Sequence, residues 1–200
     1  PHRGEGRTFG HAVFDHDGTI STLREGWERV MEPMMIKAIL GERFSEVSEK
    51  ERKDVQTKVR QFIEKTTGIQ TLSQMDALTG MVESYGFVSK EEIKEASGYK
   101  EVYNRSLMEM VEKRIAKVLK KELTVEDVTI KGALSFLRAL KDRGVVLYLA
   151  SGTDAEDVRR EAELLGYASF FDGGVYGAVG DMTVDPKQTA LKAILDTIGD

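Results

Sequence analysis

The sequence contains no cysteine and, among its 200 residues, only three prolines and one tryptophan. Without cysteine, disulfide bonds and thiolate metal sites are excluded, which suits a reducing, cytoplasmic location. Positive charge is not in excess, because the formal net charge is -5, so we expect no nucleic-acid partner and no anionic membrane partner. The longest apolar run, from Gly144 to Ala150, is too short to span a bilayer. These absences predict a soluble globular protein and leave its oligomeric state open.

Two short apolar segments predict buried strands of a parallel sheet. They are HAVFD at residues 11–15 and GVVLYLAS at residues 144–151, and each ends in a small polar cluster. Helical patterns at 132–143 and 154–165 alternate with strand-like stretches. Such alternation favours a parallel sheet with crossover helices. We therefore expect an α/β, doubly wound (Rossmann-like) core made of residues 1–21 and 129–200.

Residues 22–128 predict an all-helical unit inserted after the first strand. This segment is polar, rich in Glu, Lys and Met, and carries helix-start signals instead of strand signals. One helix is expected from Tyr99 to Lys121, and Gly68 is expected to separate two others. Three further starts fit the capping box, in which two side chains satisfy free backbone amides. They are Ser48 with Glu51, Thr71 with Gln74, and Ser89 with Glu92.

The strongest candidates for chemistry are two carboxylates, Asp15 and Asp17, in the stretch FDHDGT. Residues i and i+2 of an extended segment project to the same side, so the two acids can converge while His16 points away. In open α/β sheets, ligands bind at the carboxyl ends of the strands, where this pair lies. Neighbouring carboxylates repel unless a cation or a shared proton intervenes, and oxygen ligands suit Mg2+. We therefore predict an Mg2+ site at Asp15 and Asp17; the alternative is a simple turn or helix cap.

A second polar cluster follows the other long strand. Ser151 comes directly after the apolar run, Gly152 follows it, and Asp154 can cap the next helix. A hydroxyl beside the backbone amides of a helix start is suited to binding phosphate oxygens. Lys187, at the start of the terminal helix, is the best-placed ammonium group, since residues 142–186 contain no lysine. These features predict phosphate binding by Ser151, Gly152 and Lys187. Alternatively, the first two shape a turn and the lysine is a solvated surface residue.

The order of these motifs resembles the haloacid dehalogenase superfamily, specifically its phosphatase-like branch. The motifs are Asp-x-Asp-Gly-Thr after one strand, Ser151 after another, and then Lys187. The resemblance covers the expected core and implies that the helical insert is a cap. It also implies that Asp15 attacks phosphorus to form an aspartyl-phosphate, while Asp17 protonates the leaving oxygen and later activates water. Ser151 and Lys187 would bind the phosphoryl oxygens.

One motif of this superfamily is missing from its usual place. An apolar strand ending in Gly-Asp should follow the lysine and supply a further Mg2+ ligand. Asp181 and Asp185 have a suitable spacing but precede Lys187, and Gly199 and Asp200 follow a helix directly. We expect that the chain stops before this strand, so that the C-terminal part of the core is missing. Such a fragment would bind Mg2+ weakly and could be inactive.

Together these features predict an Mg2+-dependent phosphohydrolase of a small phosphorylated metabolite. An acid at position 17 supplies a general acid/base, which favours phosphate-ester chemistry over dehalogenation. Phosphomutase-type phosphoryl transfer is a close alternative, and a non-catalytic binding or regulatory domain of the same fold is another. Arg24 and Gln70 are the cap positions expected to contact substrate, unless they are solvated residues at helix ends.

Overall fold

The computed structural model describes residues 9–198, and the chain divides into two compact units. One consists of Pro1–Leu23 with Leu123–Asp200, and the other of Arg24–Glu122. We call them the α/β unit and the helical unit. Within the described residues, no helix is both long and apolar enough to cross a membrane.

The α/β unit is built on a parallel sheet of three strands in the order β1-β2-β3. β1 spans His11–Phe14, β2 spans Val146–Asp154 and β3 spans Gly174–Ala178. Phe14 pairs with Leu149, so the residues that follow β1 lie beside the carboxyl half of β2. The middle of β2 is buried on both faces, which explains why its sequence is a continuous apolar run. The predicted α/β class with a parallel sheet is confirmed.

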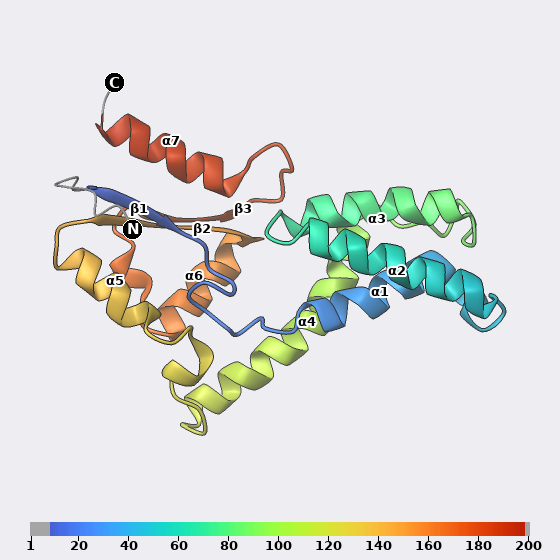
Figure 1. Ribbon diagram of the computed structural model, residues 1–200, viewed down its shortest axis with the longest axis horizontal. Helices are drawn as coiled ribbons and strands as arrows, with labels where there is room; N and C mark the ends of the chain where they lie inside the picture. Colours follow the sequence, from blue (N-terminus) through green and yellow to red (C-terminus); the bar gives the residue numbers. More distant parts are fainter. Residues whose placement is uncertain (1–8, 199–200) are drawn as a thin grey trace, which may run out of the picture. The chain divides into compact units, whose positions relative to one another are not determined.

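Helices cover both faces of this sheet (Figure 1). α5 (Ala133–Lys141) and α6 (Ala155–Leu164) lie on one face, and α7 (Pro186–Ile198) lies on the other. Short 3-10 helices at Glu126–Val128 and Ala168–Phe170 form part of the connections. A parallel sheet with helices on both faces is the doubly wound architecture that the alternating sequence pattern predicts.

β2 continues further than the sequence predicts. The strand runs through Ser151 to Asp154, with an irregularity in its pairing to β3 after Ala150. Asp154 pairs with Ala178 of β3, which keeps this polar stretch extended. α6 begins directly afterwards, but the Asp154 side chain makes no capping hydrogen bond to it. The polar cluster therefore belongs to the strand itself. Asp154 is the N-cap residue of α6, as predicted, but it holds this position without a side-chain capping hydrogen bond.

The helical unit is a set of helices packed around a hydrophobic core of aliphatic, methionine and tyrosine side chains. Gly68 adopts a positive φ of 87° between two of the helices, as expected for a residue that separates them. The elements are α1 (Glu28–Leu40), a 3-10 helix (Gly41–Ser45), α2 (Glu49–Lys65), α3 (Thr71–Tyr85) and α4 (Ala96–Leu119). Fully buried core residues include Met31, Met35, Ile39, Val55, Val59, Met75, Leu78 and Val82.

Only one of the three capping patterns begins a helix as predicted. Ser48 accepts a hydrogen bond from the Glu51 amide, and the Glu51 carboxylate accepts one from the Ser48 amide, which completes the box at α2. At α3 the N-cap residue is Gln70, and Thr71 is already helical. Ser89 donates a hydrogen bond to the Glu92 carboxylate, but both lie in a turn before α4. The capping pair is therefore present at Ser89, but α4 begins only at Ala96, although residues 90–96 have good helix propensity.

The two serines make a matched test of the capping assignment. Ser48→Ala is expected to cost about 1 kcal/mol of local stability, since it leaves the amide of Glu51 without its acceptor. Ser89→Ala is expected to cost less, because no helix begins at that residue. Amide hydrogen exchange in the first turn of α2 measures the difference. Equal protection of α2 in both variants would contradict the assignment.

Candidate active site

The two predicted acids lie at the carboxyl end of β1, where the chain turns sharply. Asp15 follows the strand directly, and Gly18 adopts a positive φ of 72° in the loop beyond Asp17. The carbonyl of His16 accepts hydrogen bonds from three successive backbone amides, which closes the loop tightly. These amides belong to Thr19, Ile20 and Ser21, at 3.3, 2.9 and 3.1 Å. The acids are therefore held by a rigid backbone turn.

Asp15 is paired with a cation from the far end of the chain. The Nζ of Lys187 donates to Oδ2 of Asp15 at 3.0 Å, although the two residues are 172 positions apart. Lys187 lies in the first turn of α7, where the Asp185 carboxylate accepts its backbone amide at 2.7 Å and so caps the helix. The amide of His16 donates to Asp15 Oδ1 at 2.9 Å. Asp15 therefore has a positive partner and remains about one-third exposed, at 36%.

Asp17 contacts a different set of side chains, which come from β2. Its Oδ2 accepts hydrogen bonds from Thr153 Oγ1 at 2.8 Å and from Ser151 Oγ at 3.3 Å. The amide of Thr153 also donates to Ser151 Oγ, at 3.1 Å. Gly152 lies between these two residues in the strand. The structure thus brings Asp17 and Ser151 together, and it adds Thr153, which the sequence analysis missed.

The extended geometry of β2 explains why Thr153 was missed. If Ser151 is treated as the last strand residue, Thr153 falls in a turn and has no fixed direction. In a strand, residues i and i+2 project to the same face, so Ser151 and Thr153 both reach Asp17. No sequence pattern in this stretch indicates that the strand continues with an irregular β2–β3 pairing.

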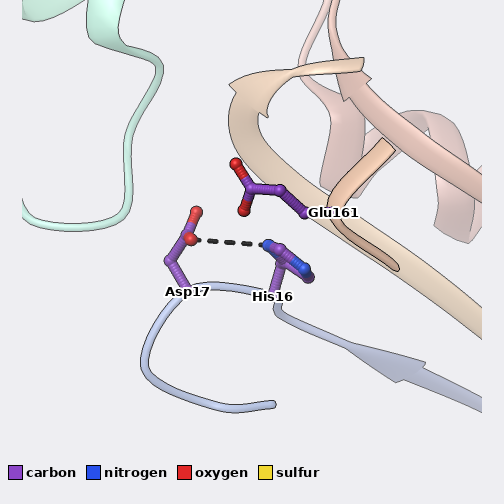
Figure 2. Close-up of side chains that lie close together, drawn as sticks. All are labelled: His16, Asp17 and Glu161. Carbon is purple, nitrogen blue, oxygen red and sulfur yellow. Dashed lines mark ion pairs between the residues drawn. The ribbon is translucent and has the colours of Figure 1, made fainter. Parts of the chain in front are cut away.

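A buried polar cluster lies behind Asp17 (Figure 2). His16 and Glu161 are completely buried, and their ligand atoms lie within 4.8 Å of each other and of an Asp17 oxygen. The His16 Nδ1 is 3.4 Å from Asp17 Oδ1, and the His16 Nε2 is 2.7 Å from the Tyr167 hydroxyl. His16 thus points into the protein, and the prediction that it points away from the acids is wrong for Asp17, which its ring approaches.

Tyr167 lies just beyond α6 and is fully buried. Burial raises the pKa of its hydroxyl well above the usual range, and the negative charges of Glu161 and Asp17 act in the same direction. A hydrogen bond with Ser21 opposes these effects. The hydroxyl therefore keeps its proton at neutral pH and can donate a hydrogen bond.

The donor atoms at this site have the chemistry of a metal centre. Asp15 and Asp17 offer carboxylate oxygens of the kind that Mg2+ prefers. Within residues 9–198, the group of at least three donors close enough to share an ion is His16, Asp17 and Glu161, which does not include Asp15. An ion at the predicted pair would therefore need further ligands from backbone or water.

The acidic residues considered for the missing motif have structural partners of their own. The Asp181 carboxylate accepts hydrogen bonds from the amide and hydroxyl of Thr183, at 2.8 and 2.7 Å. These bonds lower the pKa of Asp181 and build an exposed turn. Asp185 caps α7, and Gly199 and Asp200 lie outside the described residues.

Arg24 and Gln70, the predicted substrate contacts, belong to the helical unit. Gln70 is the N-cap residue of α3, and Arg24 Nη2 lies 3.8 Å from Met108 Sδ. Their side chains are only 7% and 6% exposed, so neither is a solvated residue at a helix end.

Gly177 allows β3 to pass close to the junction of β2 and α6. A Cβ at this position would lie 2.4 Å from Ala155 Cα and 2.8 Å from the carbonyl oxygen of Thr153. Gly177→Ala is therefore expected to lower stability by about 1–3 kcal/mol and to displace Thr153 from Asp17. A chemical denaturation curve measures the stability change. Gly10→Ala is the control, because a Cβ there would meet nothing within 4 Å; equal curves for both variants would refute the close approach.

Known structures share this fold. They include a predicted phosphatase from Clostridium acetobutylicum, which is 16% identical with a TM-score of 0.54. The match covers 96% of this chain and 71% of that protein. A β-phosphoglucomutase from Clostridium difficile is 17% identical with a TM-score of 0.60, over 94% of this chain and 70% of that protein. Among curated proteins, none matches the chain significantly.

Family membership does not depend on these distant structural likenesses. The family model for haloacid dehalogenase-like hydrolases matches residues 9–200, which is nearly the whole chain. The match includes the Asp15–Thr19 motif, the polar end of β2 and Lys187 in α7. The resemblance inferred from these motifs is confirmed, and the chain belongs to the haloacid dehalogenase-like hydrolase family.

Proposed function

We propose that this protein is an Mg2+-dependent phosphohydrolase that acts on a small phosphorylated metabolite through an aspartyl-phosphate. Asp15 is the nucleophile, Asp17 is the general acid/base, and Ser151, Gly152 and Lys187 bind the phosphoryl oxygens. The observation that carries the proposal is the Lys187–Asp15 ion pair, which joins the first strand to the last described helix. Phosphatase and phosphomutase names among proteins of the same fold also support it.

In the first step, an oxygen of Asp15 bonds to phosphorus while the bond from phosphorus to the ester oxygen breaks. Lys187 offsets negative charge on Asp15 and on the phosphoryl group, so that the two anions can approach. The leaving oxygen takes a proton from Asp17, whose Oδ2 is oriented by Thr153 and Ser151. In the second step, Asp17 removes a proton from water, and the water oxygen attacks phosphorus and releases Asp15.

Asp15 and Asp17 are the residues proposed to hold Mg2+. When bound there, the ion would neutralise phosphate charge and help to orient the phosphoryl group. Asp15 is open enough to reach both an ion and a substrate, because a third of its side chain is exposed. The helical unit is proposed to act as the cap, with Arg24 and Gln70 as the substrate contacts that select the leaving group.

Two alternatives remain distinguishable by experiment. Phosphoryl transfer between positions of a sugar is suggested by the β-phosphoglucomutase of the same fold. A non-catalytic domain is suggested because Asp181 and Asp185, the acids considered for the final motif, serve a turn and a helix cap. A burst of product with a sugar phosphate would favour the first, and binding without turnover would favour the second.

The test is a phosphatase screen of the protein encoded by the complete gene. An aryl phosphate and a panel of phosphorylated metabolites are assayed with Mg2+, then with a chelator, and then with Mg2+ restored. We expect turnover that is lost on chelation and recovered with the ion. Absence of turnover on every phosphate ester, with the protein folded and Mg2+ present, would refute the proposal.

A further inference from the structure

We propose that His16 is a positioning residue for Asp17. Its ring holds the Asp17 carboxylate in the orientation that proton transfer requires, and Tyr167 in turn holds the ring. The inference rests on the proposed role of Asp17 as general acid/base. It gives a function to a side chain that lies between two catalytic acids but faces the interior.

Both nitrogens of the His16 ring have a polar neighbour. Nε2 contacts the Tyr167 hydroxyl at 2.7 Å, and Nδ1 faces Asp17 Oδ1 at 3.4 Å. Rotation of the buried ring about its side-chain bonds would break both contacts at once. Figure 2 shows the Asp17 and Glu161 carboxylates on the same side of the ring as Nδ1. The ring is therefore oriented by burial and by its hydrogen bond with Tyr167, with Nδ1 directed at the acid but not hydrogen-bonded to it in this structure.

Tyr167 is well suited to fix this ring. Its backbone amide donates to the carbonyl of Ala162 in α6 at 3.0 Å, and its ring packs edge-on against Phe171 at 6.3 Å. The position of the hydroxyl is thus set by α6 and by the hydrophobic core. Glu161, six residues earlier and in α6, adds a buried carboxylate whose oxygen lies within 4.8 Å of ligand atoms of His16 and Asp17.

The two carboxylate oxygens of Asp17 are approached by side chains from two different segments of the chain. Oδ2 accepts from Thr153 and Ser151 of β2, whereas Oδ1 faces His16 at the end of β1. The two hydroxyls of β2 fix Oδ2 by hydrogen bonds, whereas the 3.4 Å approach of Nδ1 to Oδ1 does not meet hydrogen-bond geometry in this structure and restrains the carboxylate by close packing. Together they limit the rotation of the carboxylate. Because the bound geometry of an acid strongly affects proton transfer, a loosened Asp17 should slow catalysis more than it weakens substrate binding.

A second histidine–tyrosine pair supplies the control, with Tyr148 buried and His11 half-buried. The Tyr148 hydroxyl lies 3.1 Å from His11 Nδ1, at the opposite end of β1 from the acids. The two rings are 5.8 Å apart, close to the 6.1 Å between His16 and Tyr167. Tyr148→Phe and Tyr167→Phe therefore remove the same kind of hydrogen bond, but only one of the two bonds leads to Asp17.

Steady-state kinetics of the complete protein test the role. We expect kcat to fall about tenfold in Tyr167→Phe and about 100-fold in His16→Leu, with KM unchanged. The loss should be larger for an alkyl phosphate than for an aryl phosphate, because only the poorer leaving group needs the proton.

His16→Asn keeps a donor near the Nδ1 position and should recover part of the loss in kcat. In an Asp17→Asn background, Tyr167→Phe should have no further effect. Tyr148→Phe should leave kcat unchanged.

A measurement without turnover separates failure of this inference from failure of the proposed function. In protein with 15N-labelled histidine, Asp17→Asn and Tyr167→Phe should each shift the ring nitrogens of His16 and leave those of His11 in place. Unshifted His16 nitrogens would overturn the inference, as would equal kcat losses in Tyr167→Phe and Tyr148→Phe. A chelator-reversible metal lost in His16→Leu would also overturn it, because the cluster would then be a cation site. Absence of turnover in the wild-type protein would refute the proposed function, and the nitrogen shifts would still decide whether His16 is coupled to Asp17.

Discussion

Asp15→Asn is expected to reduce phosphatase activity by at least ~10³-fold, because an amide oxygen cannot replace the carboxylate as nucleophile. Asparagine has nearly the same shape as aspartate, so the loop should keep its structure. The ion pair with Lys187 is lost, but both side chains are partly exposed, at 36% and 42%. Such pairs contribute about 1 kcal/mol or less, so the protein should stay folded. Turnover of an aryl phosphate and a thermal melt measure the two effects.

A second Lys–Asp pair in the same unit provides the control for charge and stability. Lys141 pairs with Asp172, whose other oxygen accepts the amide of Leu147 at 3.2 Å. Leu147 is near the start of β2, so this pair lies at the amino ends of the parallel strands, whereas Asp15 lies at the carboxyl end of β1. Asp172→Asn should affect stability by a similar amount and leave turnover intact. If Asp15→Asn retained more than a tenth of wild-type activity, Asp15 would not be the nucleophile.

Asp17→Asn is expected to lower kcat by about 10²–10⁴-fold on alkyl phosphates, which is the usual contribution of a general acid or base. The loss should be much smaller in the first step with an aryl phosphate, because its leaving oxygen departs without a proton. Thr153 and Ser151 can still donate to the asparagine oxygen, so the local hydrogen bonds survive. The comparison of two leaving groups thus isolates proton transfer from positioning.

Rapid-quench measurements separate the two steps of this variant. Because the aspartyl-phosphate would form but lack a base to activate water, labelled phosphate should accumulate on Asp17→Asn protein with an aryl substrate. The same label should be absent from Asp15→Asn protein. An equal loss on both substrate classes, with no accumulated intermediate, would assign Asp17 to substrate or metal binding instead.

The local parts of the site were predictable from sequence. The apolar run before Asp15 places the acids at the end of a strand, and the next long apolar run places Ser151 beside them. Lys187 could be placed at a helix start because Pro186 and Asp185 give strong local signals. Each of these predictions needed only neighbouring residues and the rule that parallel strands end at one edge of the sheet.

The residues behind Asp17 could not be predicted in this way. Glu161 lies on a helix with a highly charged sequence, where a glutamate normally faces solvent, yet it is completely buried. Tyr167 follows that helix and is most simply read as a core aromatic. Their contact with His16 depends on how α6 packs against the sheet, which no local pattern encodes. The same limit applies to Ser89, where a correct capping pattern lacks the helix that it should begin.

The position of β1 in the sheet affects how firmly the acids are held. Among residues 9–198, β1 pairs with β2 alone, so the outward-facing amides and carbonyls of His11–Phe14 form an open edge. Phe14, the last residue of β1, packs edge to face against Phe136 of α5, and the Phe136 side chain is more than half exposed, at 57%. An extended segment added at this edge would clamp β1 from its second side. How firmly β1 anchors the turn that carries Asp15 and Asp17 therefore depends on what occupies that edge.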